Sequence, residues 1–144
     1  MIIGYDSKLC LAICANGDDT HFELQAYSLQ TFKQVFKKEY NGTYLKMKEI
    51  DQNDSGTLFV LPYTDNGKFF ISIVDNKGEE LNNIIVNGIV KIDDRSKPVT
   101  GFYEPLITTA VLPNEDIFVS VYHRYKMKQY HFIYKHKDKE FSRV

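Results

Sequence analysis

The sequence contains no tryptophan, only two cysteines and four prolines, and its 18 basic and 19 acidic residues leave a net charge of −1. A balance this close to zero selects neither nucleic acid nor a strongly charged protein as a partner of the whole chain. With 43% hydrophobic and 26% charged residues, the composition also excludes disorder as the general state of the chain. The 144 residues are enough for one folded domain with its own core.

The two cysteines, Cys10 and Cys14, cannot form a disulfide framework or a zinc site by themselves. Four residues apart on one strand, they share a face and stand about 13 Å from each other, beyond the reach of a disulfide. Two thiols are also fewer than the ligands of a structural zinc site. We expect both to be small, buried core residues, a use that is consistent with a reducing compartment.

Long hydrophobic runs are missing as well. The apolar run Leu9–Ala15 is preceded by Asp6 and a single lysine rather than by a basic segment, so it does not predict a secretory leader. No run approaches the roughly 20 apolar residues that a membrane-spanning helix needs. We therefore expect a soluble protein without a membrane span, and the unpaired thiols favour an intracellular location.

Signatures of catalysis are absent too. The sequence has no Gly-x-Ser-x-Gly, no phosphate-binding glycine loop and no Cys–His signature, and its acidic clusters lack the alternating spacing of a calcium loop. The histidines are scattered along the chain at His21, His123, His131 and His136. His123 and His131 could approach each other across a hairpin, but no third ligand is evident. The sequence gives no positive evidence for an enzyme, a metal or a cofactor.

What the sequence does contain is a β-strand pattern, which is clearest in Thr57–Val86. The apolar and β-branched runs TLFVLPY, FFISIVD and LNNIIV are separated by the short glycine-containing turns TDNGK and NKGEE. Runs of this composition joined by such turns are typical of hairpins. The pattern predicts a three-stranded antiparallel meander, with Pro62 at an edge or a bulge because proline cannot donate to a strand ladder.

Weaker versions of the same pattern flank this meander. They predict strands over 9–14, 20–28, 44–50, 106–112, 117–122, 129–136 and 140–144, with room for one more over 89–92, and loops over 51–56 and 93–104. Residues 28–40 fit either a helix that begins at Ser28 or a turn and a strand, and the Asn41-Gly42 that follows favours the turn and strand. Connections this short require antiparallel pairing, so the predicted fold class is all-β.

Three stretches can be laid over one another as strand, turn and strand, each leading to a further strand. They read LCLAIC–ANGDD–THFELQAYS, TLFVLPY–TDNG–KFFISIVD and DIFVSVYH–RYKMK–QYHFIYKH, and the first two units end in Asn-Gly at 41 and 87, 46 residues apart (87 − 41). Four strands per unit at a spacing of about 45–50 residues is the period of propeller blades. The chain thus resembles a β-propeller of the loose WD40-like or TolB-like sort, with approximate repeats 1–42, 43–92 and 105–144 in a single all-β domain, 1–144.

The resemblance implies a non-enzymatic scaffold for protein–protein interaction. Known propellers use about four to eight blades, so three blades require the remaining blades of a larger propeller, another subunit or a second copy of the chain. The sequence lacks the Gly-His, Trp-Asp and double-glycine motifs of the named subfamilies. Two other folds fit the strand count: a closed up-and-down β-barrel that carries a lipophilic small molecule, and a β-sandwich.

The most distinctive chemical feature is a basic, aromatic hairpin at residues 122–139. Residues 122–144 contain seven Lys/Arg and two Asp/Glu (7 − 2 = +5), so the preceding 121 residues carry −6. Aromatic residues between basic ones can bind nucleic acid or another anionic surface, or an acidic protein; a solvated edge strand guarded by lysines has the same composition. The candidate binding residues are Tyr122, His123, Arg124, Tyr125, Lys126, Lys128 and Tyr130.

Overall fold

A computed structural model describes residues 2–5, 9–18, 20–45, 50–89, 105–123 and 127–143, with the backbone alone for residues 2–5. In these residues the chain forms antiparallel strands and one short 3-10 helix, so the predicted all-β fold class is confirmed. The described part of the chain contains no helix that is long and apolar enough to cross a membrane.

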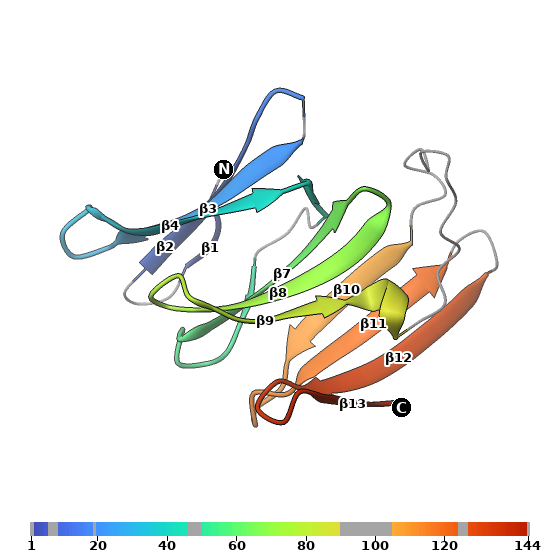
Figure 1. Ribbon diagram of the computed structural model, residues 1–144. Coiled ribbons are helices and arrows are strands. Elements are labelled where there is room, and N and C mark those ends of the chain that lie inside the picture. The colour runs from blue at the N-terminus through green and yellow to red at the C-terminus, as the bar shows by residue number, and fades with distance from the viewer. Residues whose placement is uncertain are drawn as a thin grey trace.

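The strands form three sheets that follow one another along the chain, from blue through green to red in Figure 1. Sheet A contains β1 (Ile2–Tyr5), β2 (Leu9–Ala15), β3 (His21–Ser28) and β4 (Gln34–Asn41). Sheet B contains β5 (Thr43–Tyr44), β6 (Asp51–Gln52), β7 (Leu58–Asp65), β8 (Lys68–Asp75) and β9 (Glu80–Ile85), followed by the 3-10 helix η1 (Val86–Gly88). Sheet C contains β10 (Leu106–Val111), β11 (Ile117–His123), β12 (Lys128–Lys135) and β13 (Glu140–Arg143).

Sheet B lies between the other two and is covered on both faces. Alternate residues of β7 and β8 point in opposite directions. One set packs against sheet C and consists of Leu58, Val60, Phe69, Ile71 and Ile73; the other packs against sheet A and includes Phe59, Leu61, Tyr63, Phe70 and Val74. This double burial explains why the central meander reads as nearly continuous hydrophobic runs, because a strand covered on one face alone alternates with polar residues.

Sheet A passes directly into sheet B through one glycine. Gly42 follows β4 with a φ of +109°, and a Cβ atom there would lie 2.1 Å from the backbone oxygen of Thr64 in β7. The amide of Gly42 also donates to the oxygen of Thr20 over 2.7 Å. The close approach and the positive φ both require glycine, so this residue fixes how the two sheets follow each other.

Pro62 occupies the interior of β7 rather than its end. Its carbonyl accepts a hydrogen bond from the Leu45 amide over 3.1 Å, and the nitrogen of an extended residue points to the same side as its carbonyl. On that side β5 pairs with residues 63 and 64, and β6 pairs with residues 59 and 60. The missing N–H of Pro62 therefore faces the gap between two short strands, where no ladder bond is lost.

The structure corrects both alternative folds. The closed barrel is wrong, because each of the three sheets in the described residues is open and its strands follow one another without closing into a ring. The β-sandwich is also wrong, because there are three layers and the middle one is buried on both faces.

Several strand boundaries also differ from those predicted. Residues 51 and 52 were expected in a loop but form β6, and the strand expected over 44–50 is limited to Thr43–Tyr44 in the described residues. Val86, expected as the end of a strand, begins η1. Residues 28–40 form a turn and a strand as predicted: the Ser28 hydroxyl accepts from the amides of Gln30 and Thr31, both at 3.2 Å, before β4 begins. Most of 89–92 and the predicted loop 93–104 lie outside the described residues.

The two cysteines are not core residues. Cys14 is exposed and Cys10 is partly exposed. The register pairs Cys10 with Tyr27 and Cys14 with Glu23, which places both thiols on the outer face of sheet A, while Leu9 and Leu11 face the core. The expectation of a shared face was correct, but the choice of face was wrong because cysteine and leucine are equally apolar in the run LCLAIC.

Candidate functional site

The two end sheets each expose one outer face, and the two faces differ in chemistry. On sheet A the outer face of β3 carries Glu23, Gln25 and Tyr27. The Tyr27 hydroxyl donates to the Gln25 Oε1 over 2.7 Å, and the Gln25 Nε2 donates to the Glu23 Oε2 over 2.9 Å. Lys37 of β4 lies 3.7 Å from Glu23 and 3.6 Å from Glu39. These side chains pair with one another through hydrogen bonds and opposite charges at the surface, as expected of a sheet face that remains in contact with water.

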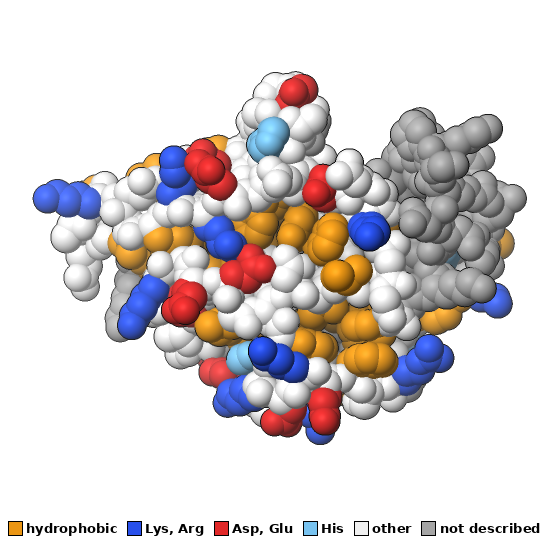
Figure 2. Space-filling model, in the orientation of Figure 1, with side chains coloured by type: hydrophobic (Ala, Val, Ile, Leu, Met, Phe, Trp, Pro, Cys, Tyr) orange, Lys and Arg blue, Asp and Glu red, His pale blue; other side chains and the backbone are white. Residues whose placement is uncertain are grey.

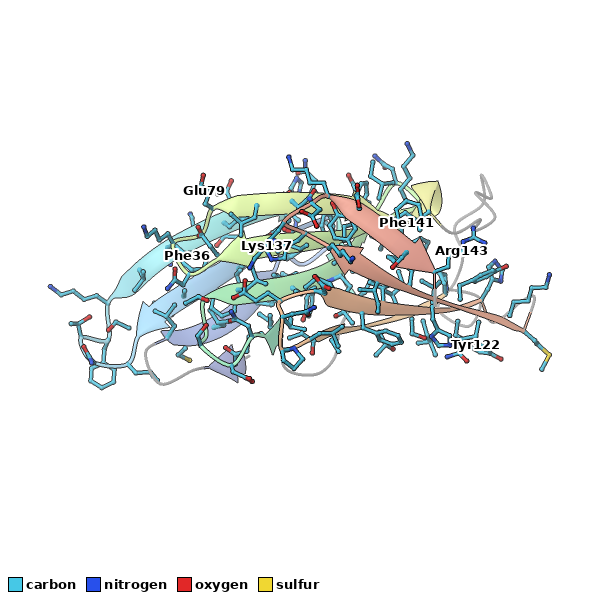
Figure 3. All side chains as sticks on the ribbon, turned by 90° about the horizontal axis from the view of Figure 1, so that it is seen from below. Phe36, Glu79, Tyr122, Lys137, Phe141 and Arg143 are labelled. Carbon is cyan, nitrogen blue, oxygen red and sulfur yellow. The ribbon has the colours of Figure 1, made fainter. Side chains whose placement is uncertain are left out.

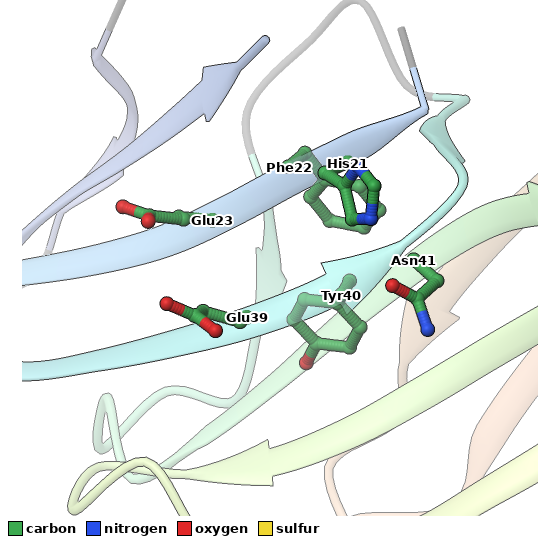
Figure 4. A pocket seen from close by; sticks show the side chains of 6 residues that line it. All are labelled: His21, Phe22, Glu23, Glu39, Tyr40 and Asn41. Atoms are coloured by element: carbon green, nitrogen blue, oxygen red, sulfur yellow. The ribbon is translucent and has the colours of Figure 1, made fainter.

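A shallow hollow of about 440 Å³ opens on sheet A beside the ends of β3 and β4 (Figure 4). It is lined by His21, Phe22, Glu23, Glu39, Tyr40 and Asn41. Both carboxylates are already paired with Lys37, and the His21 Nδ1 lies 2.9 Å from the Thr20 hydroxyl. Nowhere in the described residues do three or more His, Cys, Asp or Glu side chains form a group that could hold a metal ion. The hollow therefore lacks the convergent, unpaired groups of a catalytic or metal site.

The outer face of sheet C is built from alternate residues of three strands. The register of β10, β11 and β12 places these residues opposite one another on the side away from sheet B. They are Leu106, Thr108, Ala110, Phe118, Ser120, Tyr122, Gln129, His131 and Ile133. Apart from Lys135 at the end of β12 and its cross-strand partner Glu140 in β13, the described part of this face has no acidic residue, lysine or arginine, in contrast to the outer face of sheet A.

The geometry of this face combines aromatic stacking with small residues. The rings of Phe118 and His131 stack with centroids 5.7 Å apart and an interplanar angle of 20°. The Gln129 Nε2 donates to the Ser120 hydroxyl over 3.1 Å. Leu106 is 48% exposed, and Ile133 is half-buried although no other sheet covers it in the described structure. At one corner, Lys135 and Glu140 are direct cross-strand partners of opposite charge. The middle row of the face is Thr108, Ser120 and His131, and the larger apolar side chains lie on either side of it, Leu106 with Tyr122 and Phe118 with Ile133. Aromatic and aliphatic side chains among small polar groups are also found in protein–protein interfaces.

The structure divides the residues of the predicted basic hairpin between two faces of sheet C. Tyr122 lies on the outer face, whereas His123 is 5% exposed and Tyr130 packs against the core between sheets B and C. Lys128 is exposed, and Arg124, Tyr125 and Lys126 lie outside the described residues. Among the described residues, the aromatic and basic side chains do not form one surface. A role of this hairpin in binding nucleic acid or an anionic surface stays a prediction.

The histidine pair considered from the sequence does not meet. Ser120 is the cross-strand partner of His131, and Lys128 is that of His123, so the two rings point to opposite faces of sheet C. His136 lies instead near the turn that precedes β13, where its Nε2 is 3.9 Å from the Glu115 Oε2. Glu115 also accepts a hydrogen bond from Asn53 over 3.2 Å and lies 3.6 Å from Lys137. This group joins the ends of sheets B and C and needs no metal.

A band of apolar side chains crosses the middle of the molecule in Figure 2, in the region where β9 is in front in Figure 1. The exposed apolar residues of β9 are Leu81 (42%) and Ile85 (49%). The amide of Asn83, midway between them, already donates to the side-chain oxygen of Asn82 over 2.9 Å. Because this internal bond occupies the middle of the edge, β9 is a poorer place for an added strand than its composition indicates.

The signal for the outer face of sheet C was present in the sequence. The strand β11 reads IFVSVYH, with apolar residues at nearly every position, whereas β3 reads HFELQAYS and alternates. Continuous apolarity is typical of a strand covered on both faces, as β7 (LFVLPYTD) is. Phe118, His131 and Ile133 were not among the predicted site residues, because the charged hairpin tip that follows β11 is the more distinctive feature of the composition.

Comparison with known proteins shows a likeness of fold. No family model matches the chain, and no curated protein matches it. A solved structure that is similar is the uncharacterized protein lmo1340 from Listeria monocytogenes EGD-e, with a TM-score of 0.68 and 11% sequence identity. The likeness covers 99% of this chain and 39% of that protein, so the chain spans about two fifths of its length. At this identity the similarity establishes a shared arrangement of sheets.

Proposed function

We propose that this chain is a non-enzymatic interaction module built of stacked four-stranded sheets, in which the outer face of sheet C docks onto another β-sheet. The observation that carries the proposal is that this face presents Leu106, Phe118, Tyr122 and Ile133, is partly exposed, and has no acidic residue, lysine or arginine in the rows that β10, β11 and β12 share. An apolar sheet face of this kind marks a contact site, because exposed apolar surface is otherwise kept small on soluble proteins.

The pattern of the three sheets supports this assignment. Sheet B has two apolar faces and a sheet on each of them, and sheet A has one apolar face and one neighbouring sheet. Sheet C also has large apolar side chains on both faces, Phe118, Tyr122 and Ile133 among them on the outer one, but a neighbour on only one side in the described structure. A second neighbour would give sheet C the environment for which its residues are suited.

The strand order supports the larger assembly as a propeller-like array of blades. In each sheet the strands run in chain order, and the chain goes from the last strand of one sheet to the first strand of the next. Early strands of sheets B and C lie close together, since β10 contacts both β6 and β7. Blades of a propeller have this order, with first strands innermost. The blades would number more than three, supplied by further chain or by a partner.

The docking face can be tested with a neutral apolar dye such as Nile red, whose fluorescence rises on an exposed apolar surface. We expect the protein to bind the dye and the variant Ile133→Lys to lose most of that binding while keeping its far-UV circular dichroism. The matched control is Gln25→Lys, a polar position on the middle of the outer face of sheet A, which should change neither.

Two results would contradict the proposal. Undiminished dye binding by Ile133→Lys would place the apolar surface elsewhere. A loss of more than about 2 kcal/mol in the free energy of unfolding for Ala110→Lys, an exposed position of the same face, would show that the chain itself already covers the face, because substitutions at exposed sites usually stay within about 0.5 kcal/mol.

A further inference from the structure

The outer face of sheet C fits a particular occupant. Resting on the docking role proposed above, we infer that the sheet that covers this face is sheet C of a second copy of the chain. The two copies pack face to face about a two-fold axis, and the sheets follow one another in the order A, B, C, C, B, A.

Charge decides between the two ways in which copies can stack. If sheet C of one copy packed on sheet A of another, the contact would bury the carboxylates of Glu23 and Glu39 and the ammonium of Lys37. It would also cover the hydrogen-bonded ladder of Glu23, Gln25 and Tyr27. Burying these groups carries a desolvation cost that their mutual contacts offset only in part. Packing C on C buries none of them, because the middle of the face has no acidic residue, lysine or arginine.

Closure of the assembly gives the same answer. Stacking C on A leaves a free sheet C at the end of every open oligomer, so the contact either closes into a ring or continues as a filament. Stacking C on C uses the apolar face of both copies at once, and the polar outer face of sheet A then terminates the stack at each end. Arrays of repeats require such polar ends for solubility. The difference between the two outer faces is therefore what a closed dimer needs.

The relief of the face allows self-packing. Along β11 the outward residues are large, small and large, namely Phe118, Ser120 and Tyr122. A two-fold axis near Ser120 would set Phe118 of each copy beside Tyr122 of the other, with the small residues Thr108 and Ala110 of β10 alongside. Aromatic residues beside small ones let two sheets interdigitate at the usual spacing of about 10 Å.

The size of the face predicts a weak dimer. Strands of six, seven and eight residues in β10, β11 and β12 give a footprint of about 24 Å by 14 Å, or about 340 Å² per copy. This is below the roughly 800 Å² per partner of a standard stable interface. We therefore expect a dissociation constant in the micromolar range or above, and a dimer that is seen only as the concentration rises.

Sedimentation equilibrium from about 10 μM to about 1 mM tests the inference on the full chain. We expect the mass to rise from one to two chains, and Ile133→Lys to weaken association at least about tenfold. Ala110→Lys, at an exposed position of the same face, should act in the same way and serves if Ile133→Lys fails to fold. Gln25→Lys should associate as the unmodified protein does. A mass of one chain at every concentration overturns the inference.

A cross-linking test identifies the geometry. Sheets about 10 Å apart keep opposed cysteines beyond the reach of a disulfide, so a short bis-maleimide linker is used. In a Cys10→Ser, Cys14→Ser background, Ser120→Cys should be linked to itself as a covalent dimer, and Gln25→Cys should not. A mixed dimer of Ser120→Cys with Gln25→Cys in preference to the symmetric one would overturn C-on-C packing. A strictly monomeric protein whose dye binding still depends on Ile133 would overturn the second copy as the occupant and leave the docking face itself intact.

Discussion

The hydroxyl of Tyr40 in sheet A lies 2.8 Å from the hydroxyl oxygen of Ser72 in sheet B, and both side chains are buried. The Tyr40 ring stacks on Phe22 with centroids 4.7 Å apart, so its position is fixed from both sides. The bond is a polar contact inside an interface that is otherwise apolar. A buried hydroxyl without a partner costs free energy, so this pair couples the two sheets in one arrangement.

Removing one hydroxyl of this pair should lower the free energy of unfolding more than removing both does. We expect Tyr40→Phe and Ser72→Ala each to lower the free energy of unfolding by about 1–3 kcal/mol, because each leaves the other hydroxyl buried and unpaired. The double variant should lose clearly less than the sum, and a urea-unfolding double-mutant cycle measures the difference. Tyr27→Phe, on the outer face of sheet A, is the control and should stay within about 0.5 kcal/mol. Additive losses would show that the two hydroxyls do not interact.

Gly78, in the turn between β8 and β9, has no room for a side chain. A Cβ atom there would lie 2.7 Å from Cδ1 of Phe36, and its φ is +85°. Figure 3 shows Phe36 beside this turn, close to Glu79. We expect Gly78→Ala to lower the free energy of unfolding by at least about 1–2 kcal/mol, from backbone strain and from displacement of Phe36. Thermal or urea unfolding measures the loss.

Gly17 provides the matched control for that prediction. A Cβ atom at Gly17 meets no atom within 4 Å, and its φ lies outside the left-handed region. Gly17→Ala should therefore be neutral or raise the free energy of unfolding by up to about 1 kcal/mol, because alanine has less freedom in the unfolded chain. If Gly78→Ala and Gly17→Ala lowered the free energy of unfolding equally, crowding and backbone strain at Gly78 would not explain the loss.

Phe32 has a backbone conformation that suits a smaller residue. It has a φ of 58° and is 81% exposed at the tip of the β3–β4 hairpin, where its amide donates to the Ser28 oxygen over 2.8 Å. Left-handed backbone costs an ordinary residue about 1–2 kcal/mol, while asparagine and glycine tolerate it better. We expect Phe32→Asn to raise the free energy of unfolding by about 1 kcal/mol. Phe32→Val, which is β-branched, should lower it, and equal stabilities for the two variants would contradict the backbone explanation.

Local patterns in the sequence were sufficient to predict most of the strands. The alternation Phe22, Leu24, Ala26 placed these three residues on one face of a strand, and all three are buried in β3. The strand β6 could not be found in the same way. It consists of Asp51 and Gln52, which have no apolar pattern, and it exists because β7 offers a ladder for them to pair with. A strand that depends on a partner has no signal of its own.

The prediction that the hairpin side chains share one face of sheet C was wrong because of the strand register. Tyr122 and Tyr130 were expected to act together on the basic hairpin. The turn between β11 and β12 pairs Tyr122 with Gln129 and Val121 with Tyr130, so the two rings point to opposite faces. A shift of one residue in such a turn reverses every side chain of the following strand. Contacts across sheets, such as Tyr40 with Ser72, also depend on how the sheets stack, which composition does not encode.

Four tyrosines, three of them buried and Tyr44 partly buried, have hydroxyls whose pKa is raised above the ordinary value. They are Tyr40, Tyr44, Tyr63 and Tyr134, and burial is the main cause in each. Three of these hydroxyls also have hydrogen bonds that lower the pKa: Tyr40 with Ser72, Tyr63 with the Asn83 side chain and Tyr134 with the Asn82 side chain. These hydrogen bonds do not cancel the effect of burial, so the pKa of each hydroxyl stays raised. The folded protein thus holds these four protons more tightly than the unfolded chain does.

These tyrosines should make the protein unfold at alkaline pH. Below the unfolded pKa of about 10 both states keep the protons, so this contribution to stability is complete. As the pH rises above that value the unfolded chain releases protons that the folded protein retains, and the free energy of unfolding falls by about 1.4 kcal/mol per pH unit for each tyrosine. Tyrosinate absorbance and far-UV circular dichroism, followed together, should show part of the ten tyrosines ionising only as the strands are lost. Ionisation of all tyrosines near pH 10 with the circular dichroism unchanged would contradict this.

Tyr44 offers the sharpest control for the alkaline transition. Its hydroxyl is buried and has no hydrogen-bond partner among the described residues. Tyr44→Phe therefore removes a titrating group without orphaning a partner, and should leave the free energy of unfolding at neutral pH unchanged or slightly higher. Above pH 10 the same variant should lose stability less steeply, by about 1.4 kcal/mol per pH unit, since one fewer proton is released on unfolding. If Tyr44→Phe kept the slope of the unmodified protein, ionisation of Tyr44 would not be linked to unfolding, and burial of its hydroxyl would not oppose its ionisation.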